Sequence, residues 1–153
     1  MRAALIQLCS GDEPRANLTI TSQLVREAAR GGASFVLTPE VTNCVSRSRK
    51  HQTAVLSREA EDITLAALRE LAAELNIWLL IGSLALSTGD ADGRFVNRSF
   101  MVSPTGKIVA RYDKIHMFDV AIGGDESFAE SSAYRPGDRA VLAQTGGGRI
   151  GLT

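Results

Sequence analysis

The first 37 residues combine apolar runs with a helical pattern, and this order constrains the fold more than any other feature of the chain. The apolar run over 3–8 predicts a short buried strand, and Pro14 after two acidic residues is typical of a helix start. Apolar residues recur at helical spacing until Gly31 and Gly32 end that helix. The run over 34–37 predicts a second buried strand. Together these segments predict a β-α-β unit with parallel strands.

The pattern then repeats once and changes. Apolar residues at helical spacing predict a second amphipathic helix that ends at Asn76, followed by a core strand over 77–82. Two longer strands are predicted next, over 95–103 and 107–114, and a Ser-Pro-Thr-Gly turn joins them into a hairpin. An unrelated flavodoxin-like binding domain would continue the strand-helix alternation, so this hairpin counts against that alternative.

The end of the chain predicts two more strands, 141–143 and 149–152, around a glycine-rich turn. Residues 146–151 literally satisfy the pattern G-x-G-x-x-G, but they precede a strand, whereas the dinucleotide-binding fingerprint follows a strand and opens a helix. We therefore interpret them as a hairpin turn. An end inside an apolar strand leaves backbone groups without partners, so we expect a single domain, 1–153, that is truncated.

Length and charge narrow the class of protein. The 153 residues suit one globular domain, and 17 basic residues balance 17 acidic ones. No net charge therefore favours nucleic acid or an anionic membrane. The amino-terminal apolar run is too short for a signal peptide, and no segment approaches the roughly 20 apolar residues of a membrane-spanning helix. We expect a cytoplasmic protein with neither nucleic acid nor a membrane as partner.

Two cysteines, Cys9 and Cys44, are too few for a disulfide scaffold and do not stand at metal-ligand spacing. We therefore predict neither a structural zinc nor another cofactor. Cys9 ends a predicted strand and Cys44 closely follows Glu40, so either could in principle approach a cleft. Because a free cysteine is most often a small buried hydrophobe, we interpret both as structural.

Glu40 follows a predicted buried strand directly, in the sequence Thr38-Pro39-Glu40. Open α/β sheets place their ligand crevices at the carboxyl ends of strands. A carboxyl group that is partly desolvated there can serve as a general base. Taken alone, however, this glutamate is more readily explained as a capping or solvated residue, because helix starts favour acids.

Lys114 stands where an alternating strand ends, between aromatic and acidic residues. Its ammonium could point into a cleft and stabilise an oxyanion, or it could be an ordinary surface group at a strand end. His116 could act as a general base. A lone histidine beside apolar residues is more often a hydrogen-bonded structural group, and we favour that interpretation.

Glu130 follows a glycine-containing loop over 123–125 and could supply a second carboxylate. Two carboxylates near one lysine would hold its charge in place and shift one another's titration. The alternative is a capping glutamate before the Pro-Gly turn at Pro136, and the residues alone do not decide between the two.

Taken together, these segments resemble the nitrilase, or carbon-nitrogen hydrolase, superfamily over nearly the whole chain. The resemblance rests on the opening strand with Gln7, on Leu37-Thr38-Pro39-Glu40, on Arg111-Tyr112-Asp113-Lys114-Ile115-His116-Met117-Phe118, and on Glu130-Ser131 leading to Arg135-Pro136-Gly137. It implies an α/β fold, the α-β-β-α sandwich of the nitrilase type, of which this chain supplies roughly the amino-terminal half.

In that family a glutamate, a lysine and a cysteine form the catalytic triad. The resemblance places the first two at Glu40 and Lys114, and it assigns a second, supporting glutamate to Glu130. The family cysteine follows an apolar strand that looks like 148–153, so we expect it immediately after Thr153. Neither cysteine of this chain matches that position.

The resemblance implies hydrolysis of non-peptide carbon-nitrogen bonds in small amides. The segments around Lys114 and over 39–44 look most like the branch that acts on ω-amides and deaminated glutathione, which favours an amidase over a true nitrilase. Carbamoyl-amino-acid hydrolysis stays open. Family members commonly form homo-oligomers, and we expect one here. The alternative is a catalytically inactive binding or regulatory module, and we expect this chain alone to be inactive.

Overall fold

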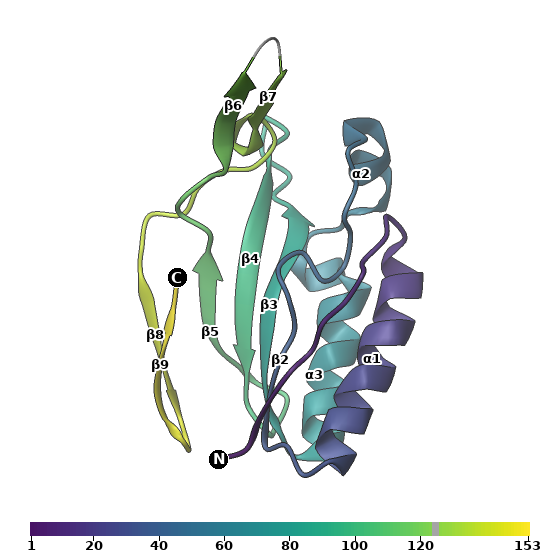
Figure 1. Cartoon of the computed structure of the whole chain (residues 1–153), viewed down its shortest axis with the longest axis vertical. Helices are drawn as coiled ribbons and strands as arrows, with labels where there is room; N and C mark the ends of the chain where they lie inside the picture. The colour runs from purple at the N-terminus through teal and green to yellow at the C-terminus, as the bar shows by residue number, and fades with distance from the viewer. Residues whose placement is uncertain (124–125) are drawn as a thin grey trace.

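The computed structural model describes residues 1–123 and 126–153 (Figure 1). Gly124 and Asp125, within the loop predicted over 123–125, lie outside the described residues. The amino-terminal elements are β1 (Ala3–Leu5), α1 (Pro14–Arg30), β2 (Phe35–Leu37), α2 (Arg49–Val55), the 3-10 turn η1 (Glu59–Glu61) and α3 (Ile63–Leu75). The rest are β3 (Trp78–Ser87), β4 (Phe95–Val102), β5 (Ile108–Asp113), β6 (Asp119–Gly123), β7 (Glu126–Ala129), η2 (Glu130–Ser132), β8 (Val141–Thr145) and β9 (Gly148–Leu152).

Five strands form the central sheet in the order β1-β2-β3-β4-β5. The first three pair in parallel, which the β-α-β pattern predicted for β1 and β2, and β4 and β5 add to them as an antiparallel hairpin. The strand β3 is longer than predicted and runs to Ser87. A register shift between Ile81 and Leu84 interrupts its pairing with β4 and lets the pairing continue beyond.

Helices α1 and α3 cover one face of this sheet, and the β8–β9 hairpin lies on the other (Figure 1). The main core fills the space between the helices and the sheet, where Leu68, Leu79 and Phe100 are fully buried. A second cluster joins Met101 and Tyr112 of the sheet to the hairpin. The layers therefore run helix, sheet, sheet.

Helix α1 begins and ends, and helix α3 ends, where the sequence predicted. Pro14 is the first residue of α1, and α3 ends at Asn76, which adopts a left-handed conformation with φ of 52°. Within the described residues, no helix combines the length and the apolar character needed to cross a membrane.

Three further features differ from the sequence-based expectation. The strand β1 has three residues instead of six, although the Ile6 amide still donates to Leu37. Helix α2 was not predicted, because its only buried residue is Gln52 and it has no apolar stripe. The β6–β7 hairpin was also missed, and it extends past the end of the central sheet (Figure 1).

Candidate active site

Glu40 lies just beyond the carboxyl end of β2, where the parallel pairing with β3 stops. The turn that follows is held tightly, because the Thr42 hydroxyl donates to the Pro39 carbonyl at 2.7 Å and the Val41 amide donates to the Ser83 hydroxyl at 2.8 Å. Val41 has a φ of 50°, which a β-branched residue rarely adopts. Backbone strain therefore sits directly beside the carboxylate.

Gly82 allows β3 to approach this turn. A Cβ atom on Gly82 would lie 2.1 Å from the Thr38 carbonyl oxygen and 2.6 Å from that of Pro39. The Ser99 hydroxyl of β4 donates to the Gly82 carbonyl at 2.5 Å and ties the next strand to the same point. The position of Glu40 thus depends on a glycine in the neighbouring strand.

Lys114 follows β5 immediately. Its amide donates to the Asn97 carbonyl at 2.9 Å, and its carbonyl accepts from the Gly137 amide at 2.9 Å. These main-chain bonds aim the side chain at two carboxylates. The ammonium lies 2.9 Å from Oε1 of Glu40 and 2.8 Å from Oε2 of Glu130. The structure therefore brings together the three residues that the sequence singled out.

Glu130 opens η2 and is buried. Its Oε2 accepts from the Phe118 amide at 2.7 Å, and both of its oxygens contact the Lys114 ammonium. These bonds of the Glu130 side chain run to Lys114 and Phe118, outside η2, so the structure favours the second carboxylate over the alternative of a capping glutamate. Burial lowers the pKa of Lys114, but hydrogen bonds and charges of Glu130 and Glu40 outweigh it and raise that pKa above its ordinary value.

Asn97 of β4 was missed by the sequence analysis. It is 2% exposed, and its Nδ2 donates to Oε1 of Glu40 at 2.7 Å. The available signal was an amide inside the mostly apolar strand Phe95–Val102. A buried amide needs hydrogen-bond partners, so such a residue points to a polar neighbour.

Three of these residues, Glu40, Asn97 and Lys114, line a cavity of about 240 Å³. Its lining consists of Glu40, Gly82, Ser83, Asn97, Ser99, Tyr112, Lys114, His116 and Thr153. His116 is exposed, and its ring makes no hydrogen bond with the part of the chain that the structure describes. Our interpretation of His116 as a hydrogen-bonded structural group is therefore wrong.

Among the larger cavities, two of about 380 and 390 Å³ lie elsewhere and share Arg98 and Asp113. These two side chains pair with each other at 2.6 Å, and Arg98 also pairs with Glu59. Their charges hold β4, β5 and η1 together. The smaller cavity is the better candidate site because it gathers acid-base groups.

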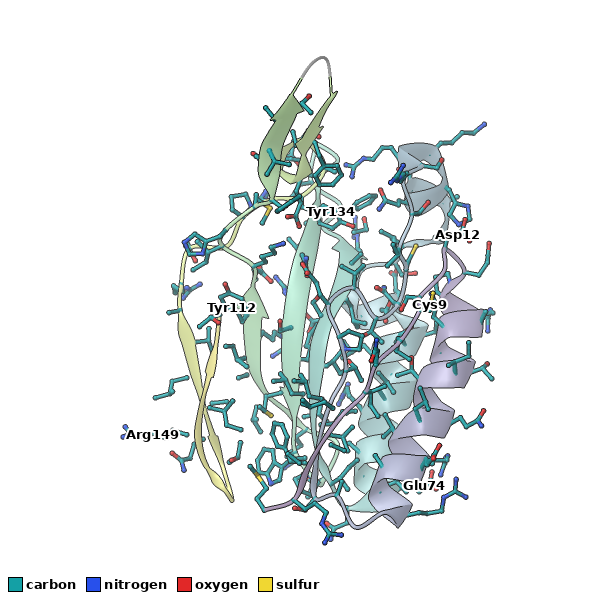
Figure 2. All side chains as sticks on the ribbon, viewed as in Figure 1. Cys9, Asp12, Glu74, Tyr112, Tyr134 and Arg149 are labelled. Carbon is teal, nitrogen blue, oxygen red and sulfur yellow. The ribbon has the colours of Figure 1, made fainter. Side chains whose placement is uncertain are left out.

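The two cysteines lie in different environments. Cys44 is fully buried, and desolvation, followed by the charges of Asp12 and Glu13, raises the pKa of its thiol to about 11. This agrees with its structural interpretation. Cys9 is exposed, so describing it as a buried hydrophobe is wrong. Figure 2 places it near the start of α1, well apart from Tyr112, which lines the cavity.

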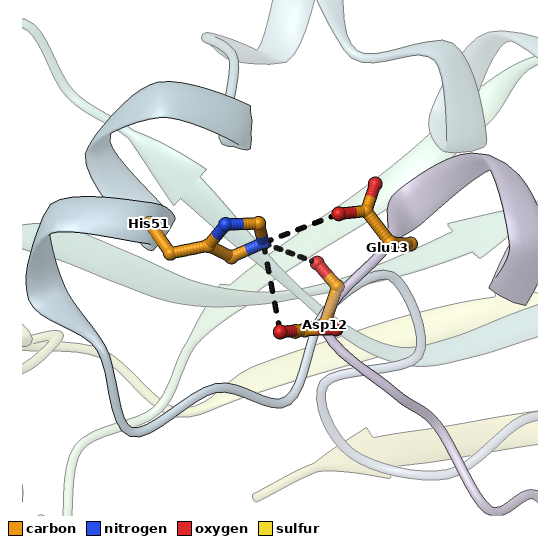
Figure 3. A group of neighbouring side chains, drawn as sticks. All are labelled: Asp12, Glu13 and His51. Atoms are coloured by element: carbon orange, nitrogen blue, oxygen red, sulfur yellow. Dashed lines mark hydrogen bonds and ion pairs between the residues drawn. The ribbon is translucent and has the colours of Figure 1, made fainter.

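A second group of ionisable side chains joins Asp12, Glu13 and His51 (Figure 3). The His51 Nε2 lies 2.9 Å from the Asp12 carbonyl oxygen and 3.7 Å from a Glu13 carboxylate oxygen. A carbonyl oxygen only accepts, so Nε2 carries the proton and offers no lone pair to a metal. We interpret the group as a contact that ties α2 to the residues before α1.

Comparison with known proteins places the chain in a family. The model of the carbon-nitrogen hydrolase family matches residues 2–153, and the chain belongs to this family. The deaminated glutathione amidase of Yersinia enterocolitica is 33% identical over 158 residues, covering 98% of this chain and 52% of that protein. The omega-amidase NIT2 of Mus musculus is 35% identical over 154 residues, with 99% and 53% covered. The chain spans about half the length of these curated relatives.

Solved structures agree on the fold. The C. elegans NitFhit protein superposes with a TM-score of 0.85 at 25% identity, covering 96% of this chain and 36% of that one. Saccharomyces cerevisiae Nit3, a member of branch 10 of the nitrilase superfamily, gives a TM-score of 0.78 at 22% identity, with 97% and 53% covered. The predicted α/β fold of the nitrilase type is confirmed.

Proposed function

We propose that the complete protein hydrolyses the carbon-nitrogen bond of small amides, with Glu40 as general base, Lys114 as the oxyanion-stabilising cation and a cysteine after Thr153 as nucleophile. The observation that carries the proposal is the Lys114 ammonium, which contacts two carboxylates and lines the same cavity as Glu40 and Thr153. A nucleophile that follows Thr153 in the chain would start from the edge of this cavity.

Burial separates the roles of the two carboxylates. The side chain of Glu130 is 9% exposed and that of Glu40 is 57% exposed. Glu130 already accepts from Phe118 and Lys114, so its place is to hold the lysine. Glu40 can reach a thiol or a water molecule, which a general base must do.

The reaction balances with these groups. Glu40 takes the thiol proton while sulfur bonds to the amide carbon, and it returns the proton to the nitrogen as the carbon-nitrogen bond breaks. Ammonia leaves and a thioester remains. Glu40 then takes a proton from water, the oxygen of that water attacks the thioester, and the thiolate leaves and recovers the proton. Lys114 stabilises each tetrahedral oxyanion by about 3–4 kcal/mol.

The substrate class follows from the relatives. The two described above are named for deaminated glutathione and for omega-amides, and we infer a substrate of this kind. Nitriles and carbamoyl amino acids use related chemistry and are the comparison substrates. We expect a cytoplasmic homo-oligomer.

The test is ammonia release by the complete gene product with deaminated glutathione and small ω-amides. Glu40→Gln is expected to lower kcat at least about 10²-fold, and Lys114→Ala about 10²- to 10³-fold. Residues 1–153 alone lack the proposed nucleophile, whose loss costs about 10⁶ in kcat in a comparable hydrolase, and are expected to be inactive.

Two results would contradict the proposal. One is turnover by residues 1–153 that Cys44→Ala abolishes. The other is a complete protein that binds amides without releasing ammonia, which is the behaviour of an inactive binding or regulatory module.

A further inference from the structure

Two donors converge on a single oxygen of Glu40. Asn97 donates to Oε1 at 2.7 Å, and the Lys114 ammonium donates to the same Oε1 at 2.9 Å. A carboxylate oxygen has two lone pairs, so Oε1 is saturated by these contacts. The other oxygen, Oε2, has no hydrogen bond within the described part of the chain.

The Lys114 ammonium has two acceptor groups. It contacts Oε1 of Glu40 at 2.9 Å and the Glu130 oxygens at 2.8 and 3.2 Å. The two oxygens of one carboxylate share a single N–H, so the third N–H of the ammonium can donate to a substrate oxyanion. As that oxyanion forms it competes with Glu40 for the ammonium, whereas the buried Glu130 carboxylate must stay paired.

Glu40 therefore needs an anchor other than the ammonium. Its side chain is 57% exposed, and a glutamate without an anchor spreads over many rotamers. Asn97 is 2% exposed and fixed within β4, and its carbonyl also accepts from the Lys114 amide. One residue thus sets the position of both groups. Its amide also carries no charge and does not titrate near neutral pH.

We propose that Asn97 is a positioning residue that holds Oε1 of Glu40 while Lys114 donates to the substrate oxyanion, which leaves Oε2 as the oxygen that takes the proton. This inference rests on the proposed amidase function. It is distinct from the roles of the cysteine, Glu40 and Lys114, because Asn97 acts only through Glu40.

The test compares two variants of the complete protein. Asn97→Ala removes the donor, and we expect kcat to fall about 10- to 100-fold, the value of a hydrogen bond to a charged group, with KM within about threefold. Asn97→Asp has nearly the same shape, but its new carboxyl group can donate to Oε1 only while protonated. Relative to Asn97→Ala, its kcat should therefore fall at least tenfold between about pH 5 and pH 8.

The ionisable groups facing this position are Glu40 after β2, Tyr112 and Lys114 at the end of β5, and His116 and Glu130 beyond it. Both variants share all of them, so the ratio of their kcat values isolates the new carboxyl group. The matched control is Asn43→Ala. Asn43 is also fully buried but bonds the main chain of Ala85, so we expect a lower melting temperature with kcat of the folded protein near the wild-type value.

The outcomes separate this inference from the proposed function. If the wild type releases ammonia and Glu40→Gln does not, a wild-type kcat in Asn97→Ala or a pH-independent ratio overturns the inference alone. If the wild type has no amidase activity, the proposed function fails. A crystal structure of Asn97→Ala then decides: a displaced Glu40 carboxylate supports positioning, and an unmoved one overturns it.

Discussion

The ammonium of Lys114 lies 2.8 Å from Oε2 of Glu130, a carboxylate whose side chain is only 9% exposed. A buried charge that loses its partner keeps its desolvation penalty without compensation. We therefore expect Lys114→Met to lower the free energy of unfolding by about 2–3 kcal/mol, somewhat less than a fully buried pair would lose because the lysine is partly exposed. Urea denaturation measures this difference.

The double variant Lys114→Met with Glu130→Gln is the internal control, since it removes both charges and should recover part of the loss. Arg26→Met is the external control. It breaks an exposed pair with Glu74, and such pairs contribute little. Equal losses in Lys114→Met and Arg26→Met would contradict a special role for the buried pair.

Deprotonation of the same lysine is expected to lower the stability of the folded protein at alkaline pH. The pKa of Lys114 is raised above its ordinary value of 10.5 because Glu130 and Glu40 outweigh the opposing effect of burial. A group whose pKa is higher in the folded state contributes fully below its unfolded pKa and loses the contribution as pH rises through the folded pKa. The unfolding free-energy difference between wild type and Lys114→Met should be constant from about pH 7 to 10 and shrink above that. A difference that shrinks between pH 7 and 9 would assign the effect to another group.

The sequence predicted the scaffold of this site better than its contacts. Glu40 follows a predicted strand and Lys114 ends another, so their places at strand ends came from apolar periodicity. That their side chains meet depends on the order β2-β3-β4-β5, which periodicity does not determine; the family resemblance supplied it. The role of Asn97 was not predicted, because its strand was assigned from the apolar neighbours and its partner Glu40 is distant in the sequence.

Helix α2 and Cys9 are two further cases in which the local sequence pattern did not predict the structure. Periodicity detects a helix through the face that it buries, and α2 buries only Gln52. Cys9 was assigned from the general tendency of cysteine to be buried, but β1 stops at Leu5 and Cys9 lies beyond the strand in an exposed segment. Both errors arise where contacts distant in sequence, not local pattern, set the burial.

Gly82→Ala tests the support of Glu40. The added Cβ would meet the main-chain oxygens of Thr38 and Pro39 at 2.1 and 2.6 Å, and backbone atoms cannot move aside cheaply. We expect a loss of about 1–3 kcal/mol in unfolding free energy and a lower kcat in the complete protein. Gly151→Ala is the matched control, because a Cβ there meets no atom within 4 Å. A Gly82→Ala protein with wild-type stability would show that the turn can shift freely.

Thiol labelling distinguishes the two cysteines of this chain. Cys44 is buried, and a pKa of about 11 keeps its thiol protonated near neutral pH, whereas Cys9 is exposed. Because the thiolate is the reactive form, iodoacetamide at pH 8 should modify Cys9 in the native protein and spare Cys44 until the protein unfolds. Peptide mass spectrometry measures both sites. Rapid native labelling of Cys44 would reopen it as a candidate nucleophile.

Thr64 offers a stabilising substitution. It is fully buried in α3, and its hydroxyl has no hydrogen-bond partner among the residues that the structure describes. A buried hydroxyl without a partner costs about 1–3 kcal/mol, and valine has nearly the same shape, so Thr64→Val should raise the free energy of unfolding by about 1 kcal/mol.

Thr21→Val is the matched control in α1, where an equally buried hydroxyl donates to the Asn17 carbonyl at 2.7 Å. Thermal and urea unfolding should show a gain for Thr64→Val and none for Thr21→Val. A gain of the same size in both would mean that valine itself, and not the missing partner, is responsible.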